Sequence, residues 1–135
     1  ILLKRHFGCS LRDWLGAAEY LLFHGNSNVV LCERGVVAPH THQPTSRFIV
    51  DLQAVPALHE LTHLPVIVDP SHATFRREYV EPVALAAVAV GADGLLIDVH
   101  PVPEKAAVDP LQDLSFPAFG ALSEKARQVA TAIGR

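Results

Sequence analysis

The chain has 135 residues, of which 50% are hydrophobic, and 11 lysines and arginines stand against 14 aspartates and glutamates, a formal net charge of −3. This composition argues against a disordered chain and supplies no broad basic surface for nucleic acid, so functional positive charge must act locally on a small anionic molecule. With two cysteines and no apolar run long enough to span a bilayer, we expect a cytoplasmic protein that does not contact a membrane.

Four short apolar runs predict β-strands at residues 1–4, 29–33, 65–69 and 94–99. Each is apolar at consecutive positions, which is typical of parallel strands buried on both faces. Helical patterns follow the strands at about 11–24, 52–62, 81–90 and 115–133. The first helix has a capping-box-like start at Ser10 and Asp13 and a stop at Gly25, and Pro82 is placed in the first turn of the third.

The order of strand and helix, repeated about every 30 residues, predicts an α/β fold built from right-handed crossover units. A complete (β/α)8 barrel takes about 250 residues, so we expect one partial barrel domain over residues 1–135, with four βα units and no second domain. The sequence opens inside an apolar run and has no methionine. We therefore expect the natural protein to begin upstream.

Ionisable residues stand where each predicted strand ends, the edge at which parallel barrels carry their chemistry. Lys4 and Arg34 end neighbouring strands and are candidates to bind one anionic group, although each could instead pair with an acid such as Glu33. His72, Asp98 and Asp109 offer one imidazole and two carboxylates, a donor set that suits Mn, Fe, Zn or Co. Hydrogen bonding at the rim is the simpler alternative for these three.

Other polar residues are interpreted as structural. Arg5 is expected to have a structural role. Cys32 is expected to be a buried, inert thiol because it lies within an apolar run. His40 and His42 stand in a long loop over residues 36–47 and are interpreted as solvated.

Several segments together resemble a known family. They are Leu3-Lys4-Arg5, Cys32-Glu33-Arg34-Gly35, the run from Pro65 to Thr74 with Asp69-Pro70-Ser71-His72 at its centre, Gly91-Ala92-Asp93-Gly94, Val99-His100-Pro101, and Pro103-Glu104-Lys105-Ala106 followed by Asp109. In this order they resemble 3-deoxy-D-arabino-heptulosonate 7-phosphate (DAHP) synthase, in the bacterial branch that also resembles the 3-deoxy-octulosonate 8-phosphate synthases. The resemblance covers the whole chain and implies the C-terminal half of a TIM barrel.

The resemblance implies a metal-dependent aldol-type condensation of phosphoenolpyruvate with erythrose 4-phosphate that releases phosphate, the first step of the shikimate pathway. It implies that Lys4 and Arg34 hold phosphoenolpyruvate, with Lys4 as a candidate catalytic residue, and that His72, Asp98 and Asp109 bind the divalent metal. Activity would then require the missing barrel half. One alternative is the same reaction type with arabinose 5-phosphate, and another is a non-catalytic half-barrel that associates with itself or a partner.

This chain departs from the family pattern at three kinds of position. Asp98 stands where glutamate is usual, which shortens a metal-binding side chain by one methylene. His6 and Phe75 stand where glycine is usual. The first four strands of the family, together with a metal-binding cysteine, have no counterpart, and neither cysteine of this chain occupies that position.

Overall fold

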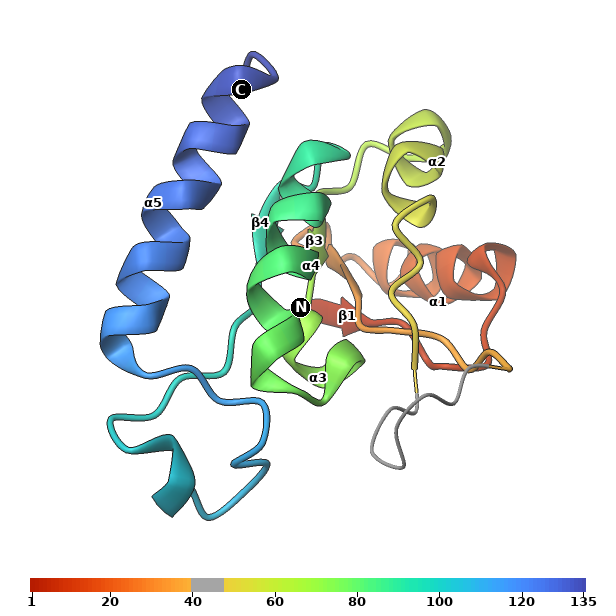
Figure 1. Cartoon of the computed structure of the whole chain (residues 1–135). Coiled ribbons are helices and arrows are strands. Elements are labelled where there is room, and N and C mark those ends of the chain that lie inside the picture. The colour runs from red at the N-terminus through yellow and green to blue at the C-terminus, as the bar shows by residue number, and fades with distance from the viewer. Residues whose placement is uncertain (40–47) are drawn as a thin grey trace.

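Four parallel strands form a single sheet in the computed structural model, which describes residues 1–39 and 48–135. The strands are β1 (Leu2–Lys4), β2 (Val30–Glu33), β3 (Val66–Val68) and β4 (Gly94–Leu95). They lie in chain order within the sheet and pair in parallel, as Figure 1 shows. The four strand predictions are confirmed in place, with β4 shorter than expected.

Helices connect and flank the strands. They are α1 (Leu11–Phe23), α2 (Ala54–Leu61), α3 (Pro70–Thr74), α4 (Arg77–Ala89), the 3-10 helix η1 (Pro103–Lys105) and α5 (Phe116–Ala132). In Figure 1, α1 and α2 lie on one flank of the sheet and α5 on the opposite flank, with α4 between. Ser10 caps α1 by accepting a hydrogen bond from the amide of Asp13, as its sequence predicts.

Two predicted boundaries were wrong. The third helix was expected at residues 81–90, but α4 begins at Arg77, so Pro82 lies inside the helix rather than in its first turn. The fourth strand was expected to reach residue 99, but β4 ends at Leu95. The reason is that β3 gives way to α3 at Pro70, which leaves the later residues of the predicted strand without a neighbouring strand on that side. The amide of Asp98 instead donates to the Ser71 hydroxyl at 3.0 Å.

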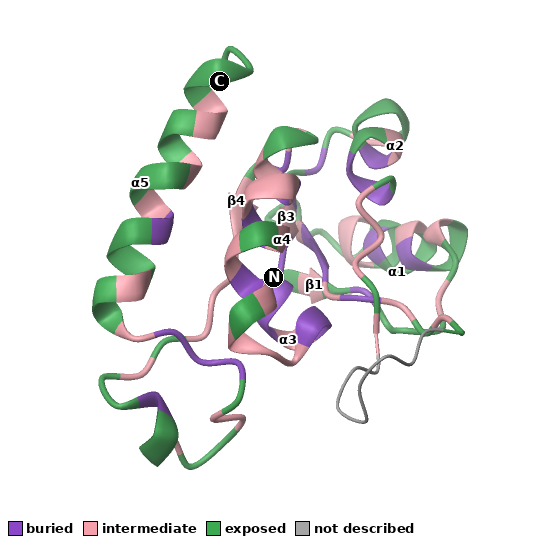
Figure 2. Ribbon diagram, viewed as in Figure 1, coloured by how far each residue is buried: buried purple, intermediate pink, exposed green. Residues whose placement is uncertain are grey.

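Most of the core lies between the sheet and the helices α1 and α2. Its buried members include Trp14 and Ala18 of α1, Leu58 of α2 and Val66 of β3. A second cluster joins α4 to α5 through residues such as Leu122. Leu122 is the one buried residue of α5, and Figure 2 shows the rest of this helix as partly or fully exposed. None of the described helices is long and apolar enough to cross a membrane.

Candidate functional site at the carboxyl ends of the strands

Lys4 lies at the carboxyl end of β1, where its ammonium contacts the residue that follows β3. Lys4 Nζ donates to Asp69 Oδ2 at 2.8 Å. The predicted pairing of this lysine with an acid therefore occurs, but with Asp69 and not with Glu33. Its side chain is 36% exposed, whereas Asp69 is fully buried. The lysine thus has a fixed anchor and a partly exposed side chain at the edge predicted to carry the chemistry.

Asp69 also begins the short helix α3, which the sequence analysis missed. Its Oδ1 accepts a hydrogen bond from the amide of His72 at 2.9 Å and thereby caps the helix, while Pro70 occupies the first helical position. An aspartate cap followed by proline is a common start of a helix, so this signal was present in the sequence. The single turn of α3 brings the His72 side chain next to the same carboxylate.

His72 and Asp98, two of the three predicted metal ligands, lie close together. Nδ1 of His72 lies 3.5 Å from Asp98 Oδ2 and 2.9 Å from Asp69 Oδ2. The ring is nevertheless not angled for a hydrogen bond, and this buried nitrogen has no hydrogen-bond partner. We take the distances to describe an electrostatic contact, since short separation without alignment makes no proper hydrogen bond.

Gln112 is a site residue that sequence reasoning did not identify. It is fully buried, and its Nε2 donates to Asp98 Oδ2 at 2.6 Å, while its Oε1 has no hydrogen-bond partner. The turn that brings it there starts at Asp109, whose carbonyl accepts from the Gln112 amide at 3.1 Å. Asp109 has a φ of 50°, a left-handed conformation that aspartate tolerates better than most residues. No pattern in the sequence points to this glutamine.

The pKa of Asp113 reflects both its burial and the negative charge around this turn. Burial raises the pKa of its carboxyl, and the neighbouring carboxylates of Asp98 and Asp109 raise it further. A site that already disfavours an added negative charge would gain from a bound cation.

Arg34 follows β2 and does not pair with a carboxylate of any described residue. Its guanidinium lies over the ring of Phe48, 4.7 Å from the centroid. The next residue, Gly35, has a φ of 97°, and a Cβ there would come within 2.8 Å of Phe48 and 3.1 Å of Ala73. Glycine is thus required for the close approach of β2, the Phe48 segment and α3. Among the described residues, no carboxylate pairs with the Arg34 guanidinium, and its role in binding an anion stays a prediction.

Arg5 is structural, as expected from the sequence. Its buried guanidinium donates to Glu33 Oε2 at 3.0 Å and to Asp51 Oδ2 at 2.8 Å. Burial alone would lower the pKa of Arg5, but the hydrogen bonds to Asp51 and Glu33 outweigh it and raise the pKa. Glu33 Oε1 also accepts from the Gly35 amide at 2.8 Å. This network holds the backbone on either side of Arg34.

Residues that could hold a divalent cation are present, although the set is incomplete. The imidazole of His72 and the carboxylate of Asp98 fit a borderline metal ion, and Nδ1 of this ring lies 3.5 Å from Asp98 Oδ2. Within the described part of the chain, however, no group of three or more His, Cys, Asp or Glu side chains is arranged to hold a metal ion. The structure therefore brings His72 and Asp98 together without completing the set through Asp109.

The two positions at which the family resemblance leads us to expect glycine, His6 and Phe75, differ in their backbone conformation. Phe75 ends α3 with a φ of 58° and a ψ of 14°, a left-handed conformation, and this costs a non-glycine residue about 1–2 kcal/mol. The His6 ring accepts a hydrogen bond from the Gly8 amide at 3.1 Å in an ordinary turn. His40 and His42 lie outside the described residues.

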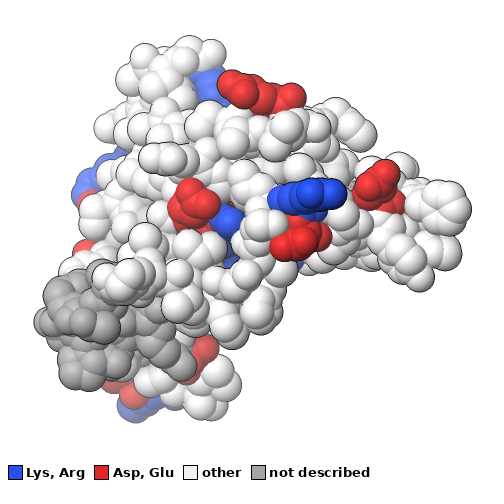
Figure 3. Space-filling view, turned by 90° about the vertical axis from the view of Figure 1, so that its right-hand side faces the viewer, with Lys and Arg blue, Asp and Glu red and all other residues white. Residues whose placement is uncertain are grey.

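The charges on the face that carries α1 and α2 are dispersed. Figure 3 shows basic and acidic side chains scattered over a surface made mostly of other residues, without a continuous patch of one sign. On this face, positive charge is available only through individual side chains.

Comparison with known proteins gives a consistent result. The model of the DAHP synthetase I family matches residues 1–135. A phospho-2-dehydro-3-deoxyheptonate aldolase of Thermotoga maritima is 42% identical over 134 residues, which cover 99% of this chain and 39% of that protein. A 2-dehydro-3-deoxyphosphooctonate aldolase of Desulfosudis oleivorans is 35% identical over 96 residues, covering 63% of this chain and 33% of that protein.

Solved structures agree. The crystal structure of the Thermotoga maritima enzyme, a DAHP synthase, superposes with a TM-score of 0.91 at 43% identity and covers 98% of this chain and 38% of that one. A truncated form of the Thermotoga maritima synthase gives the same TM-score and identity, with 50% of its chain covered. These matches confirm the predicted partial barrel, and the chain spans about two fifths of the length of the full relative.

Proposed function

The chain belongs to the DAHP synthetase I family, and from this we propose that it supplies the carboxyl-terminal strand ends of an enzyme that condenses phosphoenolpyruvate with erythrose 4-phosphate. The observation that carries the proposal is the placement of Lys4 and His72 at the carboxylate of Asp69, with Asp98 next to His72, at one edge of the sheet. The Thermotoga maritima relative, which is 42% identical, is named phospho-2-dehydro-3-deoxyheptonate aldolase. The reaction would take place in the cytoplasm, as a first step of aromatic biosynthesis.

In the proposed reaction, the electron pair of the C2=C3 double bond of phosphoenolpyruvate forms the bond from C3 to the aldehyde carbon, and the aldehyde oxygen takes up a proton. Water adds to C2 and loses a proton, and the C2–O bond to phosphate then breaks, which releases inorganic phosphate and leaves a ketone at C2 once the second proton of the water is lost. Lys4 and Arg34 would bind phosphoenolpyruvate, the first as a point charge and the second as a two-pronged donor. Their charges offset that of the substrate and fix its orientation. Lys4 is also the candidate to transfer a proton, because its side chain is partly exposed at this edge.

A divalent metal, when bound, would supply Lewis acidity that polarises the aldehyde oxygen. His72 and Asp98 would hold it, and the family resemblance proposes Asp109 as a third ligand. Asp98 is shorter than the glutamate usual at this position, and Gln112 fixes its carboxylate through the 2.6 Å hydrogen bond.

The second candidate substrate is arabinose 5-phosphate. It is favoured by the relatives named 2-dehydro-3-deoxyphosphooctonate aldolase, of which the Desulfosudis oleivorans protein is 35% identical over 96 residues. In either case we propose that activity requires the remainder of the barrel, because this chain spans 39% of the Thermotoga maritima relative.

The test is to complete the barrel. The 135-residue chain is joined to the preceding barrel segment of the Thermotoga maritima relative, and phosphate release from phosphoenolpyruvate is measured with erythrose 4-phosphate or arabinose 5-phosphate. We expect product with erythrose 4-phosphate, its loss on chelation and its return with Mn²⁺. Arg34→Met should lower kcat/KM about 100-fold or more by removing a charged donor.

The exposed Arg127→Gln on α5 is the matched control and should leave kcat/KM unchanged. Circular dichroism and cooperative thermal unfolding establish that each chimera folds. A folded chimera that makes no product with either aldehyde contradicts the proposal, and product with arabinose 5-phosphate alone reassigns the substrate.

A further inference from the structure

Asp69 has no role in the proposed reaction, yet its carboxylate contacts both groups of site residues. Its Oδ2 accepts from Lys4 Nζ at 2.8 Å and lies 2.9 Å from Nδ1 of His72. Its Oδ1 accepts from the His72 amide at 2.9 Å. The side chain is fully buried, so a phosphate-binding lysine and a metal-binding histidine are joined by one carboxylate that substrate does not reach.

Capping of α3 does not by itself explain an aspartate at this position. The cap requires only Oδ1, and asparagine or serine would provide it about equally well. Oδ2 is the additional atom, and burying its charge is unfavourable unless cations or hydrogen-bond donors compensate. Lys4 donates to Oδ2, and His72 Nδ1 lies 2.9 Å from the same atom without the alignment of a hydrogen bond. The choice of aspartate is therefore tied to these two side chains.

The same contact sets which ring nitrogen of His72 carries hydrogen. Nδ1 lies 2.9 Å from Asp69 Oδ2 and 3.5 Å from Asp98 Oδ2 without being aligned for a hydrogen bond to either, and a lone pair on a nitrogen this close to two carboxylate oxygens would be repelled. Hydrogen on Nδ1 removes the repulsion and leaves the lone pair on Nε2. Histidines that bind metals commonly have this second partner, which fixes ring orientation and tautomer.

We propose that Asp69 is a positioning residue that orients the Lys4 ammonium and holds the His72 imidazole in its Nδ1–H tautomer with a single carboxylate. The inference rests on the proposed function in so far as Lys4 and His72 are taken to bind phosphoenolpyruvate and metal. It extends that function, because it couples the two binding sites through a residue that contacts neither ligand.

Asp93 offers a matched control at the other end of the sheet, since it precedes β4. Its carboxylate likewise contacts a backbone amide, an imidazole and a cation: it accepts from the Val66 amide at 2.8 Å, lies 3.0 Å from His59 Nε2, and pairs with Arg135 at 2.5 Å. Asp93→Asn therefore perturbs a similar cluster without touching the site.

The experiment compares Asp69→Asn and Asp93→Asn with the unaltered chain. Long-range ¹H–¹⁵N correlations of the metal-free chain at about pH 8, where an ordinary histidine is neutral, identify the protonated nitrogen of His72. We expect Nδ1–H in the unaltered chain and in Asp93→Asn. We expect Nε2–H in Asp69→Asn, because the amide nitrogen of asparagine would donate to Nδ1.

Mn²⁺ affinity is the second readout, measured by calorimetry on the same samples. Asp69→Asn should weaken it about 10- to 100-fold, and Asp93→Asn should leave it unchanged. In the completed barrel, Asp69→Asn should also raise KM for phosphoenolpyruvate through the loss of the Lys4 anchor.

An unchanged His72 tautomer in a folded Asp69→Asn chain overturns the inference. If this variant fails to fold, Asp69→Ser, which keeps a capping oxygen, takes its place, and failure of both to fold overturns it as well, because Asp69 would then be purely structural. Absence of Mn²⁺ binding in the unaltered chain counts against the proposed function alone. The tautomer comparison still decides the role of Asp69.

Discussion

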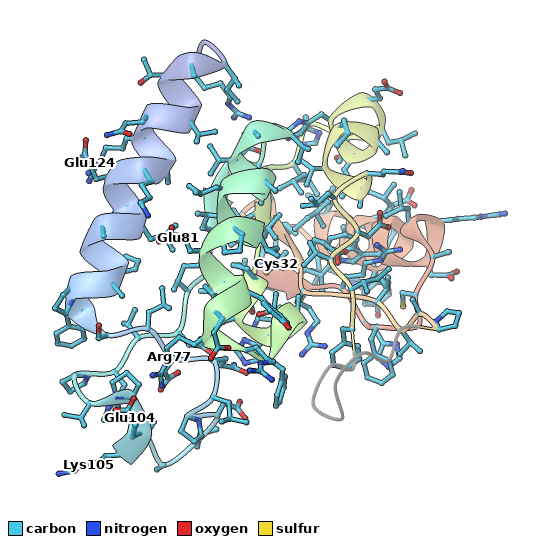
Figure 4. The ribbon with its side chains drawn as sticks, viewed as in Figure 1. Cys32, Arg77, Glu81, Glu104, Lys105 and Glu124 are labelled. Atoms are coloured by element: carbon cyan, nitrogen blue, oxygen red, sulfur yellow. The ribbon has the colours of Figure 1, made fainter. Side chains whose placement is uncertain are left out.

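Cys32 shows how completely a side chain in the centre of this sheet is withdrawn from chemistry. It lies in β2, fully buried, and Figure 4 places it in the middle of the fold. Burial raises the pKa of its thiol to about 12, and the neighbouring carboxylate of Asp69 adds to the shift. Cys9 is partly exposed. The predicted burial of Cys32 is confirmed, and its inertness becomes a testable expectation.

We expect iodoacetamide to label Cys9 and spare Cys32 in the folded chain at about pH 8. A thiol with a pKa of about 12 is roughly one part in 10,000 thiolate at that pH, compared with about a quarter for an ordinary thiol. The measurement is the rate of mass gain in Cys9→Ser, where only Cys32 remains. Labelling of this variant in native buffer as fast as in denaturant would contradict the expectation.

Arg77 fastens the loop that carries Asp109 and Gln112 to the start of α4. Its guanidinium donates to the carbonyls of Asp113 at 2.7 Å and Pro110 at 2.9 Å, and to Glu104 Oε1 at 2.7 Å. Figure 4 shows Arg77 and Glu104 close to each other near the base of α4, with Lys105 directed away. The pKa of Glu104 is lowered mainly by this hydrogen bond from Arg77.

Arg77→Met should loosen this loop. Two backbone carbonyls lose a charged donor, which we expect to cost about 1–3 kcal/mol of unfolding free energy, and amide exchange over residues 98–114 should accelerate. Glu104→Gln is the control, because it removes only an exposed, solvent-screened ion pair and leaves both carbonyl contacts in place. Hydrogen-exchange mass spectrometry measures both variants. Equal exchange rates in the two would show that the carbonyl contacts do not hold the loop.

The elements recovered from sequence are those whose signal is local. Apolar runs located all four strands, and the cap at Ser10 located α1. The start of α4 was misplaced because Pro82 suggested a first turn, whereas the Arg77 amide finds the carbonyl of Leu111 in a distant loop at 2.8 Å. β4 was drawn too long because its length depends on where β3 ends. Such partner residues are distant in the sequence and are brought together by the fold, so no periodic pattern in the sequence indicates them.

The same distinction applies to the candidate site, since local sequence indicates some of its residues and only the fold brings in the others. Strand-end placement is enough to select Lys4, Arg34, His72 and Asp98. Asp69 is visible as a strand-end acid, but its contacts depend on the turn of α3. Gln112 reaches Asp98 only through the loop held by Arg77, so it could not be selected from the sequence.

Across the whole molecule, the two ends of the sheet have different roles. The candidate site lies at the carboxyl ends of the strands. The cluster of Asp93, His59 and Arg135 lies at the opposite end of the sheet. Arg135 also bonds to the carbonyl of Gly91, so the end of α5 is tied to the start of β4. This cluster ties the residue at the end of the segment after α5 to the sheet, in addition to the packing of Leu122 against α4 and the ion pair of Lys125 with Glu81.

That attachment should give the molecule an acid-sensitive stability. Burial alone would raise the pKa of Asp93, but hydrogen bonds from the Val66 amide, Arg135 and His59 outweigh it, so the net pKa is lowered from 3.8. A carboxyl with a lowered folded-state pKa stabilises fully above its unfolded pKa and loses that contribution as pH falls through the folded value.

We therefore expect the urea midpoint of unfolding to fall as the pH is lowered from about 5 to about 3. It should fall less steeply in Asp93→Asn, because this variant has no carboxyl at position 93 to protonate. The exposed Glu60→Gln is the control and should follow the unaltered chain. Equal slopes in the unaltered chain and Asp93→Asn would mean that the C-terminal attachment of α5 does not depend on the charge of Asp93.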